Sequence, residues 1–120
     1  MPYALLVVEP VGQRQQRTPE EGQAAYAAML AYAGELQQSG KLLAVQALTS
    51  QQVATRVETR AGRTRLIDGP FAETKEMVGG FFLVDCASRD EALALAARCP
   101  AAAWASIEVR ATGTCFEDTL

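Results

Sequence analysis

Four charged residues gather near the middle of the chain, Asp68, Glu73, Lys75 and Glu76. A lysine between two carboxylates can be held charged as an anchor for an anion, and a carboxylate whose pKa is raised can act as a general acid or base. These four are therefore the candidate catalytic residues, and Asp68 and Lys75 are also candidates for binding a ligand. The structural alternative is that Asp68 stabilises a turn, while the other three form exposed or interfacial ion pairs.

The segment around this cluster predicts a turn that leads into a buried strand. In Asp68-Gly69-Pro70, the aspartate can bond nearby backbone groups, the glycine tolerates a positive φ and the proline fixes its own φ. The apolar run 77–84 comes directly after the cluster, so the ionisable groups are expected at the rim of a sheet. Gly79-Gly80 weakens that run as a strand, which favours a bulge over the close approach of a backbone or a ligand.

Histidine is absent from the sequence. Its absence excludes any Ser-His or Cys-His nucleophile pair, any histidine metal ligand and any general base whose unperturbed pKa lies near neutrality. A reaction would therefore depend on carboxylates, lysine, tyrosine, cysteine or a cofactor. No pattern in the sequence indicates a metal or a cofactor, and we predict neither.

The composition predicts one soluble globular domain over residues 1–120. The chain is 49% hydrophobic and 21% charged, which is ordinary for such proteins. A net charge of −3 gives no electrostatic case for nucleic acid or for an anionic membrane. We see neither a signal peptide nor an apolar run of the ~20 residues that span a bilayer. The expected location is the cytoplasm, with no nucleic-acid or membrane partner.

The three cysteines are also typical of a reducing compartment. Their number is odd and they form no close pair, so a disulfide framework is not indicated. Nothing near them predicts a lowered thiol pKa, so inert or partly buried thiols are favoured over redox-responsive ones. These residues are Cys86, Cys99 and Cys115.

Apolar spacing predicts the elements that position the candidate residues. A buried strand runs from 3 to 8 and is ended by Glu9-Pro10. After a polar loop, a capping-box pattern at 18–21 begins a helix that ends at Ser39-Gly40. The apolar stripe of this helix favours core packing over a ligand site. It consists of Tyr26, Met29, Leu30, Ala33 and Leu36.

The second half of the chain alternates between strands and one more helix. The strand at 77–86 is the most hydrophobic and is expected at the centre of the sheet. A second capping box, at 88–91, opens a helix that stops before Pro100, and the only tryptophan, Trp104, lies in the connection that follows. The remaining segments are a strand at 41–49, a hairpin with strands 53–60 and 64–67 around a turn at 61–63, a last strand at 106–111 and a tail at 112–120.

The order of these elements predicts an α+β fold. Without the hairpin it reads βαββαβ, the ferredoxin-like pattern in which two helices cover one face of an antiparallel sheet. The other face has nothing from its own chain to cover it, although the strands carry apolar residues on both sides. We therefore expect a homodimer through the open sheet face.

The stretch from Asp68 to Phe82, DGPFAETKEMVGGFF, closely resembles the signature of the YCII-related proteins. It is most similar to the DGPF subgroup, which is named after the four residues at 68–71. The likeness extends from the strand at Tyr3 to 98–100 and 107–110. The resemblance implies a ferredoxin-like fold, with an inserted β-hairpin in this chain, that dimerises sheet to sheet as an α/β barrel.

The resemblance implies less about function. Most DGPF proteins have no assigned reaction, and many are encoded beside sigma factors of the extracytoplasmic-function type. The wider family includes members with a His-Asp pair and a dehydrochlorinase that acts on a chlorinated aromatic. Because this chain has no histidine, that pair cannot be assigned to any of its positions.

Two hypotheses about function remain open. In the first, the protein binds a small organic ligand between sheet and helices or at the dimer interface, with enzymatic activity left open, and Tyr3 and Arg110 are further ligand-binding candidates. In the second, it is a non-enzymatic dimeric module in sigma-factor signalling. Such a module needs an exposed apolar patch outside the dimer interface, for which the tail around Phe116 is the candidate.

Overall fold

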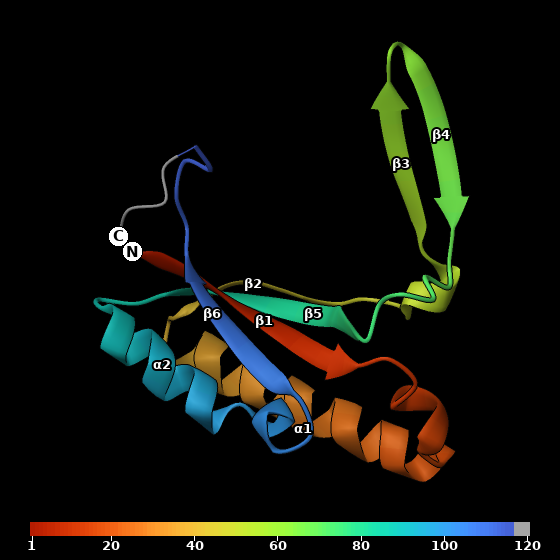
Figure 1. Cartoon of the computed structure of the whole chain (residues 1–120). Coiled ribbons are helices and arrows are strands. Elements are labelled where there is room, and N and C mark those ends of the chain that lie inside the picture. The colour runs from red at the N-terminus through yellow and green to blue at the C-terminus, as the bar shows by residue number, and fades with distance from the viewer. Residues whose placement is uncertain (117–120) are drawn as a thin grey trace.

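A computed structural model describes residues 1–116 as an α+β fold with two α-helices and antiparallel sheets (Figure 1). The strands are β1 Pro2–Pro10, β2 Leu42–Ala47, β3 Thr55–Arg60, β4 Arg63–Asp68, β5 Glu76–Asp85 and β6 Ser106–Ala111. The helices are α1 Pro19–Gln38 and α2 Arg89–Arg98, with short 3-10 turns η1 Arg14–Gln16, η2 Gln51–Val53 and η3 Pro100–Ala103.

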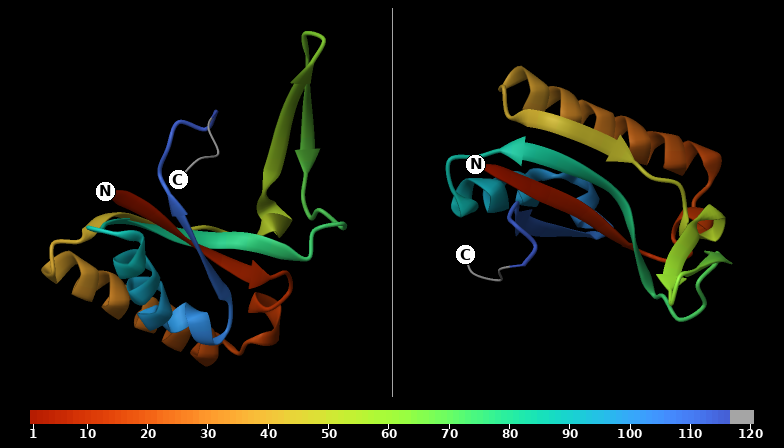
Figure 2. Two further views of the ribbon diagram at one scale, coloured as in Figure 1. Left: turned by 60° about the vertical axis from the view of Figure 1, so that its left-hand side comes forward. Right: turned by 90° about the horizontal axis from the view of Figure 1, so that it is seen from above.

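The main sheet has four strands in the order β2-β5-β1-β6, and each neighbouring pair is antiparallel. This order agrees with the ferredoxin-like pattern and confirms the central place of β5. Both α-helices lie against one face of the sheet, whereas the separate two-stranded hairpin β3–β4 rises on the other side (Figure 2). The layers are therefore helix and sheet, and no helix of residues 1–116 covers the second sheet face.

The core lies between the helices and the sheet. Alternate residues of β1 point into it, beginning with Tyr3 and Leu5, and Phe82 and Val84 of β5 do the same. This alternation follows from the two-residue period of a strand. On β6, Ile107 packs against the same core while its sequence neighbours are exposed, as predicted.

Helix α1 begins as the sequence predicts. The Thr18 hydroxyl accepts from the Glu21 backbone N–H, and the Glu21 carboxylate accepts from the Thr18 N–H at 2.8 Å. The prediction of core packing is wrong for Tyr26 and Leu30, which are 56% and 55% exposed. Tyr32 occupies the core instead, and its hydroxyl donates to the Leu95 carbonyl of α2 at 2.6 Å.

Helix α2 carries only half of its predicted capping box. The Ser88 hydroxyl accepts from the Glu91 N–H, but Glu91 does not return a bond to Ser88. Its carboxylate accepts instead from the Ala87 N–H at 2.9 Å and forms an ion pair with Lys41. The side chain that a local pattern assigned to the cap therefore links α2 to the start of β2.

Strand β3 begins later than predicted, and Gly69 has a different role. Residues 51–53 form η2, so the alternating segment starts at Thr55 rather than Val53. Gly69 does not have a positive φ. A Cβ at this position would overlap the Gln51 carbonyl, so glycine is required by the close approach of η2. The Gly69–Pro70 peptide bond is cis.

Strand β5 contains the predicted bulge. Its pairing with β1 shifts between Val7 and Val8, which leaves Gly79 unpaired in the ladder. The close approach that was the alternative also occurs, because a Cβ on Gly80 would lie 2.7 Å from the Gln46 carbonyl oxygen of β2. The two interpretations of this glycine pair are therefore both correct.

Residues 112–116 follow β6 without joining a strand. The Thr112 N–H donates to the Pro2 carbonyl at 3.2 Å, and Phe116 is exposed. Positions 117–120 of the predicted tail lie outside the described residues. Within 1–116, neither helix combines the length and apolar character needed to cross a bilayer.

Candidate ligand-binding cleft

A cleft of about 420 Å³ lies between α1 and the sheet, where β1 ends and β5 begins. Helix α1 forms one wall and β2 forms the opposite one, and η1 and η3 close the sides. Volumes of about 300–1,000 Å³ are typical of small-molecule sites. Three charged residues line the cleft, Glu9, Arg14 and Arg17.

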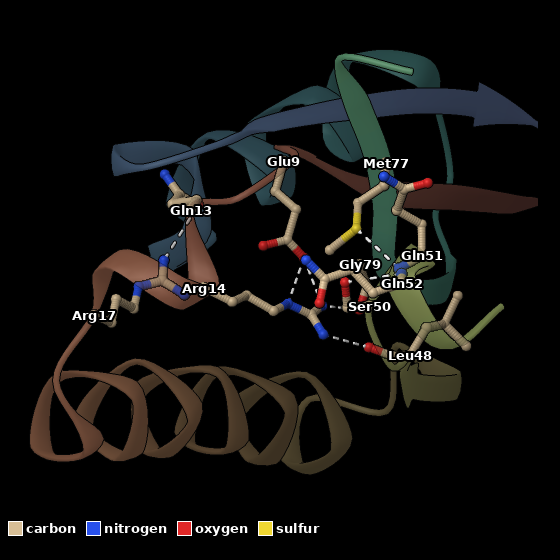
Figure 3. A network of polar contacts seen from close by, with 10 residues as sticks. All are labelled: Glu9, Gln13, Arg14, Arg17, Leu48, Ser50, Gln51, Gln52, Met77 and Gly79. Carbon is tan, nitrogen blue, oxygen red and sulfur yellow. Dashed lines mark hydrogen bonds and ion pairs between the residues drawn. The ribbon is translucent and has the colours of Figure 1, made fainter. Parts of the chain in front are cut away.

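The Glu9 carboxylate is held by Arg14 (Figure 3). Its Oε1 accepts from Arg14 Nη2 at 2.5 Å and from Nε at 3.1 Å. The same guanidinium donates to the Leu48 carbonyl at 2.8 Å and to the Gly79 carbonyl at 3.3 Å. Arg14 therefore joins the ends of β1 and β2 to the bulge of β5, and most of its donors are engaged.

Glu9 is a largely buried residue, and one of its carboxylate oxygens has no hydrogen-bond donor in the described chain. The residue is only 5% exposed, and no hydrogen bond to its Oε2 comes from residues 1–116. Figure 3 shows this oxygen directed away from the Arg14 guanidinium. Oε2 is not fully buried and keeps access to the open cleft, so a hydroxyl or N–H group on a ligand can donate to it there.

Local sequence explains how the pair is assembled. Glu9 follows Val7 at the next inward-facing position of β1, so the strand itself directs its side chain toward the helix layer. Pro10 ends the strand, and the turn that follows carries Arg14 on η1. Gly79 leaves room for the carboxylate, because a Cβ there would overlap Glu9 Oε1 and lie 2.8 Å from Arg14 Nη2.

Arg17 is the second cation of the cleft, and its environment differs from that of Arg14. Its guanidinium carbon lies 5.6 Å from the centre of the Trp104 ring, which is a cation–π arrangement. Its Nη2 donates to Gln13 Oε1 at 3.3 Å, and Gln13 Nε2 donates to the Trp104 carbonyl at 2.6 Å. Arg17 takes part in no ion pair within the described chain.

The remaining lining is largely apolar. Tyr26, Met29 and Leu30 face the cleft from α1, and Leu48 faces it from the end of β2. Tyr26 and Leu30 are the exposed residues of the predicted helix stripe, so their spacing marks a cleft wall as well as a core face. An apolar wall with a few convergent polar groups is typical of a binding site for an organic molecule.

The candidate residues from the central charged cluster lie on the hairpin side of the molecule. Asp68 is the last residue of β4 and accepts from the Thr55 hydroxyl at 2.8 Å. Glu73 is paired with Arg56 at 3.0 Å. Its own backbone N–H and then the Arg56 guanidinium hold the pKa of Glu73 below its usual value.

The other two cluster residues are exposed and lie where the chain enters β5. The Lys75 carbonyl accepts from the Val11 N–H at 2.9 Å, which extends the pairing of β5 with β1. Glu76 lines a second hollow of about 440 Å³ together with Phe71 and Met77. None of the four cluster residues lines the cleft between α1 and the sheet.

The two remaining candidates lie on opposite faces of the sheet. Tyr3 is buried in the core between sheet and helices. Arg110 is exposed and pairs with Ala4, a position of β1 that points to the open face. The structure therefore brings together neither these two residues nor either of them with the central cluster.

The buried cysteines have the properties predicted for inert thiols. Burial raises the pKa of the Cys86 and Cys99 thiols above their ordinary value. Cys115 is exposed. A raised pKa lowers the thiolate fraction near neutral pH, and the thiolate is the reactive form.

Comparison with known proteins identifies the family. A model of the YCII-related domain matches residues 1–112. The chain belongs to the YCII-related family. It is also similar to "Uncharacterized protein R00369" of Rhizobium meliloti (strain 1021), with 52% identity over 56 residues. That match covers 47% of this chain and 45% of the relative, so less than half of the relative's length is spanned.

The cleft lies within the YCII-related domain, because all of its lining residues fall between 7 and 104. Sequence reasoning missed Glu9, Arg14 and Arg17 as site residues. One signal was available for Glu9, which continues the inward-facing series of β1 and so predicts a buried charge. Arg14 and Arg17 lie in a polar loop, where residue spacing gives no comparable signal.

Proposed function

We propose that this protein binds a small organic molecule in the cleft between α1 and the sheet. The observation that carries the proposal is Glu9, a largely buried carboxylate whose one unpartnered oxygen is accessible in a mainly apolar cleft. Whether the cleft also supports a reaction is left open by the proposal, which concerns binding. The membership of the chain in the DGPF subgroup is part of the same proposal.

A thermal-shift screen of small aromatic and carboxylate metabolites tests the binding. A ligand that binds only the folded state raises the melting temperature, by mass action. We expect at least one compound to stabilise the wild type and to lose this effect in Gly22→Leu. Gly22 lines the cleft, and a Cβ there meets nothing within 4 Å, so a side chain can be added at this position and we expect leucine to occupy part of the cleft.

Gly34→Leu is the matched control. Gly34 is also a helical glycine with no atom within 4 Å of a Cβ, but it does not line the cleft. Both substitutions remove a glycine from α1, so both raise helix propensity equally. Stabilisation by ligands that survives in Gly22→Leu, or no stabilisation across the whole library, would contradict the proposal.

We also propose that the protein is a homodimer through the open sheet face, as an α/β barrel. The support is a set of half-buried apolar side chains on that face, which nothing else in the described chain covers. The set includes Leu6, Val8, Phe81 and Leu83. Sedimentation should give a dimer for the wild type and for Leu93→Glu on α2, and a monomer for Phe81→Asp.

A second candidate function is a regulatory module that contacts a signalling protein, and the hairpin β3–β4 favours it. Val57 and Leu66 face each other across the hairpin and are 63% and 66% exposed. We expect a Val57→Ser/Leu66→Ser variant to lose binding to a purified extracytoplasmic-function sigma factor while keeping the ligand response. Equal sigma-factor binding by variant and wild type, or no binding by either, would exclude this surface.

A further inference from the structure

From the charges and donors of the cleft we infer its ligand class, an apolar or aromatic carboxylate that also carries a hydroxyl or N–H donor. The inference rests on the proposed function, because it concerns the same cleft. It assigns the carboxylate of the ligand to Arg17, the donor to Glu9 and the apolar body to the wall formed by α1.

The charge of the cleft favours an anion. Of the three charged residues that line it, Glu9 and Arg14 neutralise each other in an ion pair, so Arg17 leaves one net positive charge. The chain as a whole has a net charge of −3, so the sign in the cleft is opposite to that of the molecule. Burial in a partly apolar cleft strengthens the attraction of this charge for an anionic ligand.

Arg17 is available for that anion, whereas Arg14 is not. Arg14 donates to a carboxylate and to two carbonyls, but Arg17 makes one side-chain hydrogen bond, to Gln13, within residues 1–116. The guanidinium lies over the Trp104 ring at 5.6 Å, and no hydrogen bond from its Nε or Nη1 goes to residues 1–116. A planar guanidinium held in this way can bind a carboxylate with two parallel hydrogen bonds.

Glu9 requires the opposite kind of group. Its Oε2 can only accept, and it receives no donor from the described chain. A second carboxylate on the ligand would repel it, whereas a hydroxyl or N–H would satisfy it. The cleft therefore selects a molecule with two different polar ends.

The apolar wall defines the body between those ends. Tyr26, Met29 and Leu30 provide a continuous apolar face, and the Trp104 ring lies close to Arg17. A flat ring fits this lining because aromatic faces and a thioether both pack well against it. A ring that separates a hydroxyl from a carboxylate is accordingly the simplest form of the ligand.

A matched series of four compounds tests the assignment. The compounds are 4-hydroxyphenylacetate, its neutral amide, phenylacetate and tyramine, which vary the anion and the donor one at a time. Calorimetry gives the affinities. The fluorescence of Trp104, the only tryptophan, reports binding at the cleft, with free tryptophan as the control for light absorption by the phenols.

We expect 4-hydroxyphenylacetate to bind roughly tenfold more tightly than its amide, which reflects one charge-assisted pair. Phenylacetate should bind more weakly than the hydroxylated compound, and tyramine should not bind. In Arg17→Gln the preference for the carboxylate over the amide should fall to about one, while the affinity for the amide stays unchanged. Arg60→Gln, at the exposed tip of the hairpin, should keep the full preference.

Equal or tighter binding of the amide or of tyramine overturns the inference, and so does a carboxylate preference that survives in Arg17→Gln. The inference also fails if no compound of the series changes Trp104 fluorescence. If the screen still finds a ligand whose stabilising effect is lost in Gly22→Leu, the proposed function stands and only the ligand class is wrong. If the screen finds no such ligand, the proposed function and the ligand class are both wrong.

Discussion

Two arginine–carboxylate pairs lie on either side of β5, and they differ mainly in burial. In the cleft, Arg14 and Glu9 are 2.5 Å apart, with side chains 31% and 6% exposed. Near the hairpin, Arg56 and Glu73 are 3.0 Å apart, with side chains 48% and 73% exposed. The first pair joins the ends of β1 and β2 to the bulge of β5, whereas the second stabilises a surface loop.

The comparison teaches that a dense run of charges in a sequence is a poor guide to a site. The exposed pair includes a residue from the conspicuous cluster at 68–76, where water can solvate every charge. The buried pair consists of two residues from unremarkable segments, and neither has a charged neighbour of the opposite sign in the sequence. Burial, rather than local charge density, makes a polar group available for selective binding.

The largest expected effect is on the free energy of unfolding when each arginine is removed. Arg14→Ala leaves Glu9 buried without its partner, which should cost about 3–5 kcal/mol. Arg56→Ala should cost far less, because water replaces the lost contact to Glu73. Urea denaturation of both variants measures the difference.

High salt distinguishes the buried Arg14–Glu9 pair from the exposed Arg56–Glu73 pair. Added salt should weaken the contribution of Arg56 and leave that of Arg14 almost unchanged, since exposed charges are screened and buried ones are not. If the two alanine variants lost equal stability at every salt concentration, the contrast between the pairs would be wrong.

The next effect concerns stability when a side chain is added at a glycine in a tight contact, Gly69, and at one in open space, Gly34. Gly69→Ala places a Cβ against the Gln51 carbonyl and 3.3 Å from the Ala54 carbonyl oxygen, and backbone atoms yield little. We expect a loss of about 1–3 kcal/mol, the usual range for overpacking. Gly34→Ala, in open space on α1, should instead gain about 1 kcal/mol of helix propensity. Equal unfolding midpoints for the two variants would show that the hairpin base tolerates a side chain.

The smallest effect is on the titration of Glu73. Its pKa is lowered first by its own backbone N–H and second by Arg56, so Arg56→Ala should raise the pKa only part of the way back. Because the folded pKa lies below the unfolded one, the stability from this group is present above the unfolded pKa and is lost as pH falls through the folded pKa. Carboxyl NMR measures the shift, and a complete return to the ordinary value would assign the whole effect to Arg56.

Most of the fold follows from periodicity and capping. Thr18 and Gly40 mark the ends of α1, and the alternation at 106–111 gives the bounds of β6. Errors occur where a distant partner overrides a local pattern. Glu91 accepts from Ala87 and pairs with Lys41 instead of completing the cap. Glycine is required at position 69 because η2 packs closely against it, and not because the residue has a positive φ.

The cleft was less predictable than the fold, because its polar groups meet only after the strands have paired. Arg14 is fixed by the carbonyls of Leu48 and Gly79, which are distant in sequence and carry no side-chain signature. Tyr26 and Leu30 have the spacing of core residues on a helix, and that spacing does not show that they face a cleft instead of packed side chains. Only the inward position of Glu9 was open to inference from the sequence.

The hydroxyl of Tyr32, which joins α1 to α2, makes the helix layer sensitive to strong alkali. Burial is the main cause that raises the pKa of Tyr32 from 10.0 to about 12. The unfolded chain therefore releases this proton at a lower pH than the folded one does. The stability that the phenol contributes is complete below pH 10.0 and disappears as the pH rises through about 12. Between pH 10.0 and about 12 the folded protein keeps this proton, so unfolding in that range should release up to one more proton from the wild type than from Tyr32→Phe.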